Sequence, residues 1–192
     1  NRDKRAEKFL FCHVDPKFKD DYIHNYNRGR GPSDHEVFSA AIFLKHYAKA
    51  FRELFLQGDP IVIARMITGC IHQPANTPQE QIENCLIMLI NGQAIDVDKL
   101  DYLVRDSKRA DLPYGNVIDV DRLVRSLTVV LTKDDKGDTL LTLGTYEKGQ
   151  SAAESVTFAR YELYQALYWH HAIRAIRPML REVLRSGDFE KA

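Results

Sequence analysis

Residues 95–106, Ile-Asp-Val-Asp-Lys-Leu-Asp-Tyr-Leu-Val-Arg-Asp, constrain the fold more than any other stretch of this sequence. If the stretch is a helix, Asp98, Tyr102, Arg105 and Asp106 fall on one stripe, because residues three, four and seven or eight apart share a face. The aliphatic side chains fall towards the other side and can pack into a core: Val97, Leu100, Leu103 and Val104. The pattern therefore predicts a helix with two acids, a phenol and a guanidinium on one face.

The remaining sequence predicts a mainly α fold with one small β-hairpin. Helical patterns that begin at Ser, Asp or Pro signals cover five further stretches: residues 33–56, 60–71, 78–90, 119–127 and 151–185. Asp59 is expected to cap the second of these, and Pro178 should kink or divide the last. Residues 127–132 and 139–146 are rich in Val, Thr and Leu and predict a hairpin over about 127–146.

Length and composition indicate an ordinary globular protein. At 192 residues the chain can bury one good core, so one main domain is expected. We expect an irregular N-terminal segment over residues 1–32, a helical domain over 33–186 and a tail over 187–192. Lys and Arg together number 27, as do Asp and Glu, so net charge gives no argument for a nucleic-acid or membrane partner.

Two further features bear on the cellular setting. No apolar run approaches the length of a membrane-spanning helix. Cys12, Cys70 and Cys85 lack metal-ligand spacing, which favours reduced thiols in a cytoplasmic protein.

The central stretch also carries a family resemblance. Asp-Val-Asp-Lys-Leu-Asp-Tyr-Leu-Val-Arg-Asp resembles the fourth signature of the HD-domain metal-dependent phosphohydrolases. The similarity is greatest to the deoxynucleoside triphosphate (dNTP) triphosphohydrolases, which include the dGTPases and the sterile-alpha-motif/HD dNTPase. The resemblance implies an HD-domain-like helical bundle in which Asp98 binds a metal and Lys99 reaches a substrate phosphate. It also implies that Tyr102 and Asp106 contact the sugar and its 3′-hydroxyl. The alternative is a solvated helix face with intrahelical ion pairs.

His35 and Glu36 follow a Gly-Pro-Ser-Asp loop at the predicted start of a helix. The positive dipole field there favours a neutral imidazole, which can act as a base or hydrogen-bond partner. The HD dNTPases have a similar His-Glu pair, whose His points at the phosphates and assists attack at the α-phosphorus. The resemblance thus implies a catalytic role for His35, with Glu36 beside it. A helix-start acid next to a chance His is the alternative.

Residues 159–171, Ala-Arg-Tyr-Glu-Leu-Tyr-Gln-Ala-Leu-Tyr-Trp-His-His, form a second candidate constellation. Four side chains fall on one helical stripe: Arg160, Tyr164, Tyr168 and His171. An Arg suits phosphate and a Tyr can stack on a base or sugar, although aromatic residues packed into a core would show the same spacing. Many bacterial HD phosphohydrolases have a similar run. The resemblance implies that Arg160 holds phosphate, that Tyr168 lies against deoxyribose, and that His170 or His171 contacts substrate.

The family's metal ligands are incomplete here. The HD site needs an upstream His and a His-Asp pair, and this sequence contains no adjacent His-Asp. One carboxylate, Asp98, cannot hold a catalytic divalent ion, because such ions need several ligands in fixed geometry. We therefore expect the remaining ligands for a divalent metal (Mg, Mn, Fe, Ni or Zn) to lie outside this chain, which alone would be inactive. A degenerate homologue is the alternative.

The sequence thus predicts part of an HD-superfamily phosphohydrolase that converts dNTPs to deoxynucleosides and triphosphate. The alternative function is a catalytically silent HD-like module that binds a nucleotide and regulates or contacts a partner. A homo-oligomer is also expected, because the exposed helices of a partial domain need partners. A nucleic-acid-binding module that uses the Arg-rich face of residues 174–185 is disfavoured by the neutral net charge.

Overall fold

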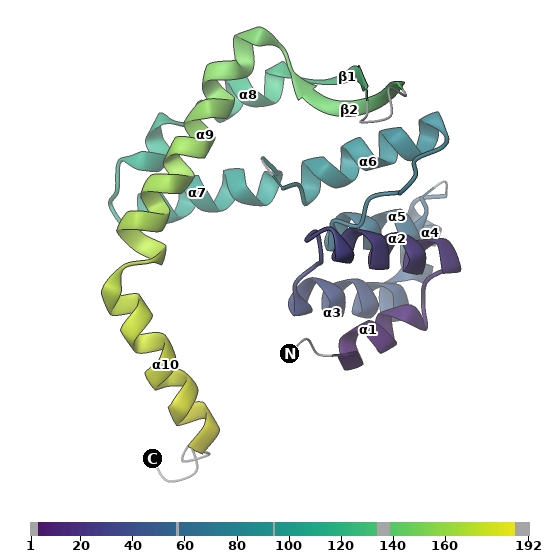
Figure 1. Cartoon of the computed structure of the whole chain (residues 1–192), viewed down its shortest axis with the longest axis horizontal. Coiled ribbons are helices and arrows are strands. Elements are labelled where there is room, and N and C mark those ends of the chain that lie inside the picture. Colours follow the sequence, from purple (N-terminus) through teal and green to yellow (C-terminus); the bar gives the residue numbers. More distant parts are fainter. Residues whose placement is uncertain (1–3, 57, 94, 134–138, 187–192) are drawn as a thin grey trace. The chain divides into compact units, whose positions relative to one another are not determined.

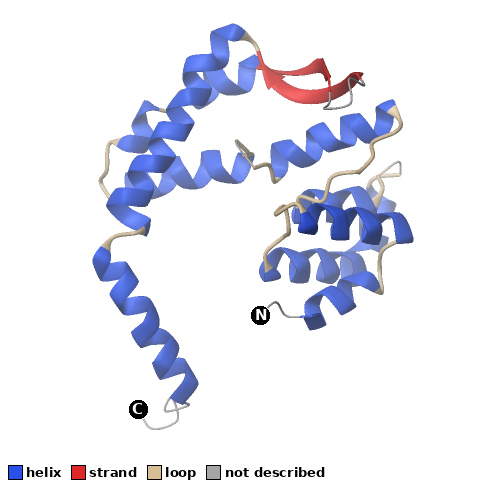
Figure 2. Cartoon of the chain, in the orientation of Figure 1, coloured by secondary structure: helices blue, strands red, loops and turns tan. Residues whose placement is uncertain are grey.

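The structure, a computed structural model, describes residues 4–56, 58–93, 95–133 and 139–186. This part of the chain is mainly α-helical and contains one two-stranded antiparallel sheet, which confirms the predicted fold class (Figures 1 and 2). The chain divides into two compact units. Unit 1 comprises Asn1–Lys99 and Leu127–Tyr146, and unit 2 comprises Leu100–Ser126 and Glu147–Ala192.

Unit 1 consists of six helices and the hairpin within the described residues: α1 (Lys4–Phe11), α2 (Pro16–Asn27), α3 (Asp34–Ile42), α4 (Ala48–Leu54), α5 (Pro60–Thr68), α6 (Pro78–Ile90), β1 (Leu127–Lys133) and β2 (Thr139–Thr145). A π-helical segment, Phe43–Tyr47, joins α3 to α4. The predicted start of α5 is confirmed, because the Asp59 carboxylate accepts a hydrogen bond from the backbone N–H of Ile61 at 2.9 Å.

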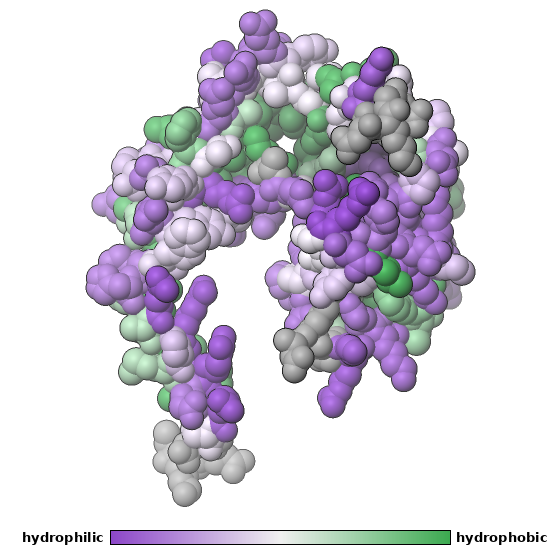
Figure 3. Space-filling model, in the orientation of Figure 1, coloured by the Kyte–Doolittle hydropathy of each residue, from purple (hydrophilic) through white to green (hydrophobic). Residues whose placement is uncertain are grey.

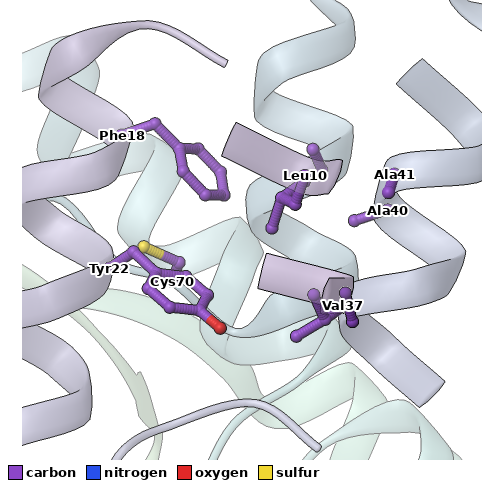
Figure 4. Close-up of a cluster of buried hydrophobic side chains, with 9 residues drawn as sticks. Leu10, Phe18, Tyr22, Val37, Ala40, Ala41 and Cys70 are labelled. Carbon is purple, nitrogen blue, oxygen red and sulfur yellow. The ribbon is translucent and has the colours of Figure 1, made fainter. Parts of the chain in front are cut away.

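The prediction of an irregular segment over residues 1–32 is wrong for most of its length. Residues 4–11 and 16–27 form α1 and α2, and the Asp15 side chain caps α2 by accepting from the Phe18 N–H at 2.7 Å. Their apolar residues recur at helical spacing and enter the unit's core. The labelled members of this core are Leu10, Phe18, Tyr22, Val37, Ala40, Ala41 and Cys70 (Figure 4). The burial of Leu10 and Phe18 stabilises these two helices despite the high charge around them.

The predicted hairpin is confirmed. Strands β1 and β2 pair antiparallel in a register that runs from Leu127 opposite Thr145 to Lys133 opposite Thr139. Strand β2 packs on α6, where the Gln81 side-chain oxygen accepts from the Leu141 N–H at 2.9 Å. The predicted turn of the hairpin, residues 134–138, lies outside the described residues.

Unit 2 is helical in its described part: most of α7 (Val97–Arg109), α8 (Val120–Ser126), α9 (Gln150–Leu163) and α10 (His171–Ser186), with single 3₁₀ turns at Tyr114–Val117 and Glu147–Gly149. Helix α9 packs against the first 3₁₀ turn and against α8. Gly115 in that turn permits a close approach of the turn to α7, because a Cβ there would lie 2.6 Å from the Leu103 carbonyl oxygen. The Gly115 N–H instead donates to the Ser107 hydroxyl at 2.7 Å.

The long C-terminal helix is divided, but not at the predicted residue. Pro178 lies inside α10, and the break falls at Trp169 and His170 (Figure 1). A π-helical segment, Tyr164–Tyr168, follows α9 directly, and its last turn closes when the Trp169 N–H donates to the Tyr164 carbonyl at 2.8 Å. The division therefore follows a change of helical winding beyond Leu163, the last buried residue in the described part of the chain, rather than the missing N–H of Pro178.

Helix α10 has no buried residue, although it is strongly amphipathic. Its large apolar side chains are exposed: Ile173, Ile176, Met179, Leu180, Val183 and Leu184. Figure 3 shows hydrophobic and hydrophilic residues on different sides of this helix. Among the described residues no helix combines the length and apolar character needed to cross a membrane.

Candidate functional site

Unit 2 brings together five of the side chains singled out on the two helical stripes. We call them the tyrosine–aspartate cluster: Tyr102, Asp106, Arg160, Tyr164 and Tyr168. The Tyr168 hydroxyl donates to the Asp106 carboxylate at 2.7 Å, and the Tyr102 ring meets the Tyr168 ring edge-on with centroids 6.0 Å apart. The Tyr164 ring contacts Tyr168 at 5.1 Å, and the Arg160 guanidinium lies 5.6 Å from the centre of the Tyr164 ring.

The sequence positions this cluster by simple helical spacing. Tyr102 and Asp106 are four residues apart on α7, so they share one face, while Leu103 between them is fully buried. Arg160, Tyr164 and Tyr168 are likewise four apart along α9 and the π-helical segment. The buried aliphatic residues anchor each element, which leaves the polar stripes to meet at the edge of the core.

The Tyr168–Asp106 hydrogen bond is electrostatically polarised. Partial burial, followed by the hydrogen bond to the Asp106 carboxylate, raises the pKa of Tyr168 well above its ordinary value. The phenol therefore keeps its proton at neutral pH and remains a hydrogen-bond donor to the carboxylate. The Asp106 side chain is 32% exposed, and its other oxygen, Oδ1, lies 3.6 Å from Arg105 Nε. A carboxylate has about four acceptor positions, so Asp106 retains capacity for a ligand hydroxyl.

Arg105 lies on a solvated helix face and forms an intrahelical ion pair, as the alternative interpretation of residues 95–106 predicts. Its guanidinium pairs with Asp101 at 3.0 Å, and both side chains are more than half exposed. This is the intrahelical ion pair expected of a solvated helix face. Of the α7 stripe, Arg105 therefore pairs at the surface with Asp101, whereas Tyr102 and Asp106 enter the cluster.

The two predicted histidines lie beyond the cluster at the start of α10. His170 and His171 are exposed, and their rings contact each other at 4.2 Å. The Ala172 N–H donates weakly to His170 Nδ1 at 3.4 Å. Trp169, which precedes them, stacks edge-on against Tyr164 at 5.1 Å.

In unit 1, Glu36 has a structural role at the start of α3. Its Oε2 accepts from the Ser33 N–H at 2.6 Å and from the Ser33 hydroxyl at 2.7 Å. Its Oε1 accepts from the Asn91 amide at 2.8 Å, which ties α3 to the loop after α6. His35 is exposed, with Nδ1 3.0 Å from the Ser33 hydroxyl. His35 is thus accessible to a ligand, whereas Glu36 is largely engaged within the protein.

Lys99 and Asp98 occupy the first turn of α7. The Lys99 ammonium donates to Asp96 Oδ2 at 2.5 Å and to the Gly92 carbonyl at 2.7 Å. Asp96 also accepts the Lys99 backbone N–H at 2.7 Å, as an N-cap does. In this conformation Lys99 therefore closes the loop before α7 rather than extending towards a ligand. Asp98 is exposed. The role of Asp96 was not predicted from the sequence, although an Asp at a helix start was the signal for it.

The described residues do not by themselves fit a divalent metal. Across this part of the chain, no three His, Cys, Asp or Glu side chains converge at distances that could hold an ion. Asp98 offers a single exposed carboxylate, and stable sites use several fixed ligands. We therefore assign no chemical step in this chain to a metal.

Unit 1 also contains a buried polar network that was not predicted from the sequence. The Arg65 guanidinium pairs with the Asp21 carboxylate at 2.9 Å, and both side chains are 2% exposed. Asp21 also accepts the Gln73 N–H at 2.9 Å, and His72 Nε2 contacts Glu83 at 2.8 Å. Arg65 is the one charged residue of the apolar helix α5, and that isolation was the available signal. The network ties α2, α5 and α6 together.

Comparisons with known proteins support the family resemblance. Residues 118–188 match the family model described as the HD associated region, a stretch that includes Arg160, Tyr164 and Tyr168. The uncharacterized protein MJ1154 of Methanocaldococcus jannaschii is 35% identical over 103 residues, which are 54% of this chain and 21% of that protein. The uncharacterized protein YwfO of Bacillus subtilis is 25% identical over 162 residues, 83% of this chain and 34% of that protein.

This chain thus spans between a fifth and about a third of the length of these curated relatives. No solved structure matches it. Together the matches indicate an HD-domain-related protein, without distinguishing one branch of that superfamily.

Proposed function

We propose that this chain supplies the sugar- and phosphate-binding part of an HD-superfamily phosphohydrolase that acts on deoxynucleoside triphosphates. The reaction would release a deoxynucleoside and triphosphate. The observation that carries the proposal is the 2.7 Å hydrogen bond from Tyr168 to Asp106, with the Tyr102 ring packed edge-on against the same phenol. The match of residues 118–188 to the HD associated region supports the superfamily.

The cluster offers the groups that a deoxyribose needs. Asp106 Oδ1 can accept a hydrogen bond from a 3′-hydroxyl while Oδ2 keeps the hydrogen bond from the Tyr168 hydroxyl. Because Asp106 and Tyr102 both restrain the Tyr168 ring, that ring would form a rigid wall against the sugar. A rigidly held ring discriminates against an added 2′-hydroxyl by steric exclusion, whereas a mobile ring would move aside and admit the ribonucleotide.

The phosphates would be bound by cationic side chains. Arg160 is on the same element as Tyr168, and its fork of N–H donors matches phosphate oxygens. By the family resemblance, Lys99 would reach a substrate phosphate once it leaves Asp96, and His35 would orient the attacking water or protonate the leaving oxygen. By the family resemblance, Asp98 would be one ligand of a divalent metal, and a complete metal site would need further ligands besides it.

A catalytically silent HD-like nucleotide-binding or regulatory module is the second candidate. The engagement of Lys99 by Asp96, and of Glu36 by Ser33 and Asn91, favours it, because neither charged group is poised for a substrate. This candidate predicts nucleotide binding without turnover.

Isothermal titration of the 192-residue chain with the four dNTPs and the four ribonucleotides, in the presence of Mg²⁺, tests the proposal. We expect tighter binding of at least one dNTP than of its ribonucleotide, and a loss of about tenfold in affinity, ~1.4 kcal/mol, in Asp106→Asn and Tyr168→Leu. Asp101→Asn, an exposed carboxylate on the same helix, is the matched control and should bind as the wild type does. Equal binding of both sugars, or no binding, would refute the proposal.

Turnover separates the two candidates. Triphosphate release is assayed with the full-length protein in the presence of Mg²⁺ or Mn²⁺. Release supports the hydrolase, and binding without release supports the silent module.

A further inference from the structure

We infer that Tyr164 is a positioning residue that couples the phosphate side of the proposed nucleotide site to its sugar side. This inference rests on the proposed function and deepens it. Sequence spacing placed Tyr164 on a stripe with Arg160 and Tyr168 but assigned it no role of its own. Its contacts in unit 2 supply one.

The Tyr164 ring lies between the two groups that would hold the ligand. The Arg160 guanidinium carbon is 5.6 Å from its ring centre, within the range of a cation–π contact. The Tyr168 ring is 5.1 Å away at an interplanar angle of 66°, and the Trp169 ring is 5.1 Å away at 77°. Edge-to-face packing of this kind stabilises a defined ring orientation. Tyr164 therefore fixes Arg160 on one side and Tyr168 on the other.

The backbone reinforces this arrangement. Tyr164 is the first residue of the π-helical segment, and its carbonyl accepts the Trp169 N–H at 2.8 Å, five residues on. π-Helical turns are rare and are frequent at functional sites. Here the turn carries Tyr164 at its start and Tyr168 at its end, where the phenol reaches Asp106. The ring contacts and the π-helical backbone thus both help to position Tyr164 and Tyr168.

A cation–π contact offers the guanidinium no oxygen acceptor, so it leaves the N–H donors able to bind phosphate oxygens. Tyr164 can therefore orient Arg160 without competing for the phosphate. In the same way its contact with Tyr168 leaves the Tyr168–Asp106 hydrogen bond intact. Loss of the Tyr164 ring should consequently weaken the binding of both the phosphates and the sugar. Loss of a residue that contacts only one of these ligand groups would weaken the binding of that group alone.

The test uses two partial ligands, sodium triphosphate and the deoxynucleoside of the best-binding dNTP, together with that dNTP, each titrated into the 192-residue chain by NMR. Arg160→Gln should weaken only triphosphate, and Tyr168→Leu only the deoxynucleoside. Tyr164→Leu should weaken both, each by about threefold to tenfold, whereas Tyr164→Phe, which keeps the ring, should bind as the wild type does. Tyr161→Leu, an exposed tyrosine on α9, is the matched control and should change neither.

The single tryptophan gives a readout that needs no ligand. Trp169 contacts Tyr164 directly, so its emission should change in Tyr164→Leu and not in Tyr164→Phe or Tyr161→Leu. Circular dichroism monitors folding. If Tyr164→Leu unfolds, Tyr164→Met fills the space without a ring and takes its place.

The outcomes are distinguishable. If the wild-type chain binds the dNTP and Tyr164→Leu leaves both partial ligands unaffected, or weakens only one, this inference is overturned and the proposed function stands. If the wild-type chain binds no dNTP, the proposed function is overturned and this inference falls with it. Weakening of both ligands, with rescue by Tyr164→Phe, supports the inference.

Discussion

Tyr168 and Asp106 are 62 residues apart in the sequence, and their side chains are joined by a 2.7 Å hydrogen bond. The bond links α7 to the π-helical segment after α9, so one contact fixes both stripes of unit 2. A carboxylate acceptor makes it stronger than a hydrogen bond between neutral groups. Because the bond also determines how the Tyr168 ring is held, it is the contact on which the proposed sugar site depends most.

The Asp106 charge should be measurable through the titration of Tyr168. Burial raises the pKa of the phenol first, and the hydrogen bond and charge of Asp106 raise it further. Asp106→Asn should therefore lower the pKa of Tyr168 and leave it above the ordinary value, because the burial remains. NMR of ¹³Cζ-labelled tyrosine measures this, with Asp101→Asn as the control. An unchanged pKa in Asp106→Asn would mean that burial alone accounts for the shift.

The buried Asp21–Arg65 pair should dominate the stability of unit 1. Arg65→Met leaves the Asp21 carboxylate buried without its partner, which typically costs about 3–5 kcal/mol of unfolding free energy. The exposed pair Lys49–Glu53, 3.9 Å apart, is the matched control, and Lys49→Met should cost less than about 1 kcal/mol. Urea denaturation measures both. Equal costs for the two variants would contradict a structural role for the buried pair.

His72 should make unit 1 less stable in mild acid. Burial, followed by the charge of Arg65, lowers the pKa of His72 in the folded protein, although Glu83 acts in the opposite direction. The unfolded chain therefore binds this proton first as pH falls. The stability contributed by neutral His72 is complete above the unfolded pKa, about 6.5, and is lost as pH falls from there through the folded pKa.

In His72→Gln the urea midpoint of unfolding should accordingly fall less steeply than in the wild type as pH is lowered from about 8 to about 5. His24→Gln, which replaces an exposed histidine of the same unit, is the matched control. A decline that is equally steep in His72→Gln would assign the acid sensitivity to other groups.

The fold was predictable where local signals determine it. Asp59 before Pro60 marked the start of α5, and Asp119 marked the start of α8, where its carboxylate accepts the Arg122 N–H at 2.9 Å. The failures occurred where tertiary packing outweighs local signals. Helices α1 and α2 are stabilised by burial of side chains such as Leu10 in a shared core, which composition alone does not reveal. Pro178 is tolerated in α10, whereas the π-helical winding, which had no marker in the sequence, divides the long helix.

The sequence predicted which residues of the candidate site share a helix face, but it did not predict which residues of the other helix they contact. Helical spacing identified Tyr102 with Asp106, and Arg160 with Tyr168, as residues that share a stripe. It could not show that the two stripes meet, because that depends on how α9 packs in unit 2. Arg65 was missed for a related reason: its partner Asp21 lies in a segment that was predicted to be irregular.

Lys99 should be a phosphate ligand only after it is released from Asp96. Asp96→Asn keeps an oxygen that can cap α7, because Asn is as good an N-cap as Asp, but it removes the charge that holds the Lys99 ammonium. We therefore expect near-wild-type stability and an increase in triphosphate affinity of about threefold to tenfold, which corresponds to ~0.7–1.4 kcal/mol. Lys99→Met should abolish this gain in the double variant. Titration of sodium triphosphate measures the affinity, and urea denaturation checks the cap. If Lys99→Met leaves triphosphate affinity unchanged in both the wild-type and the Asp96→Asn backgrounds, Lys99 serves only to close the loop before α7.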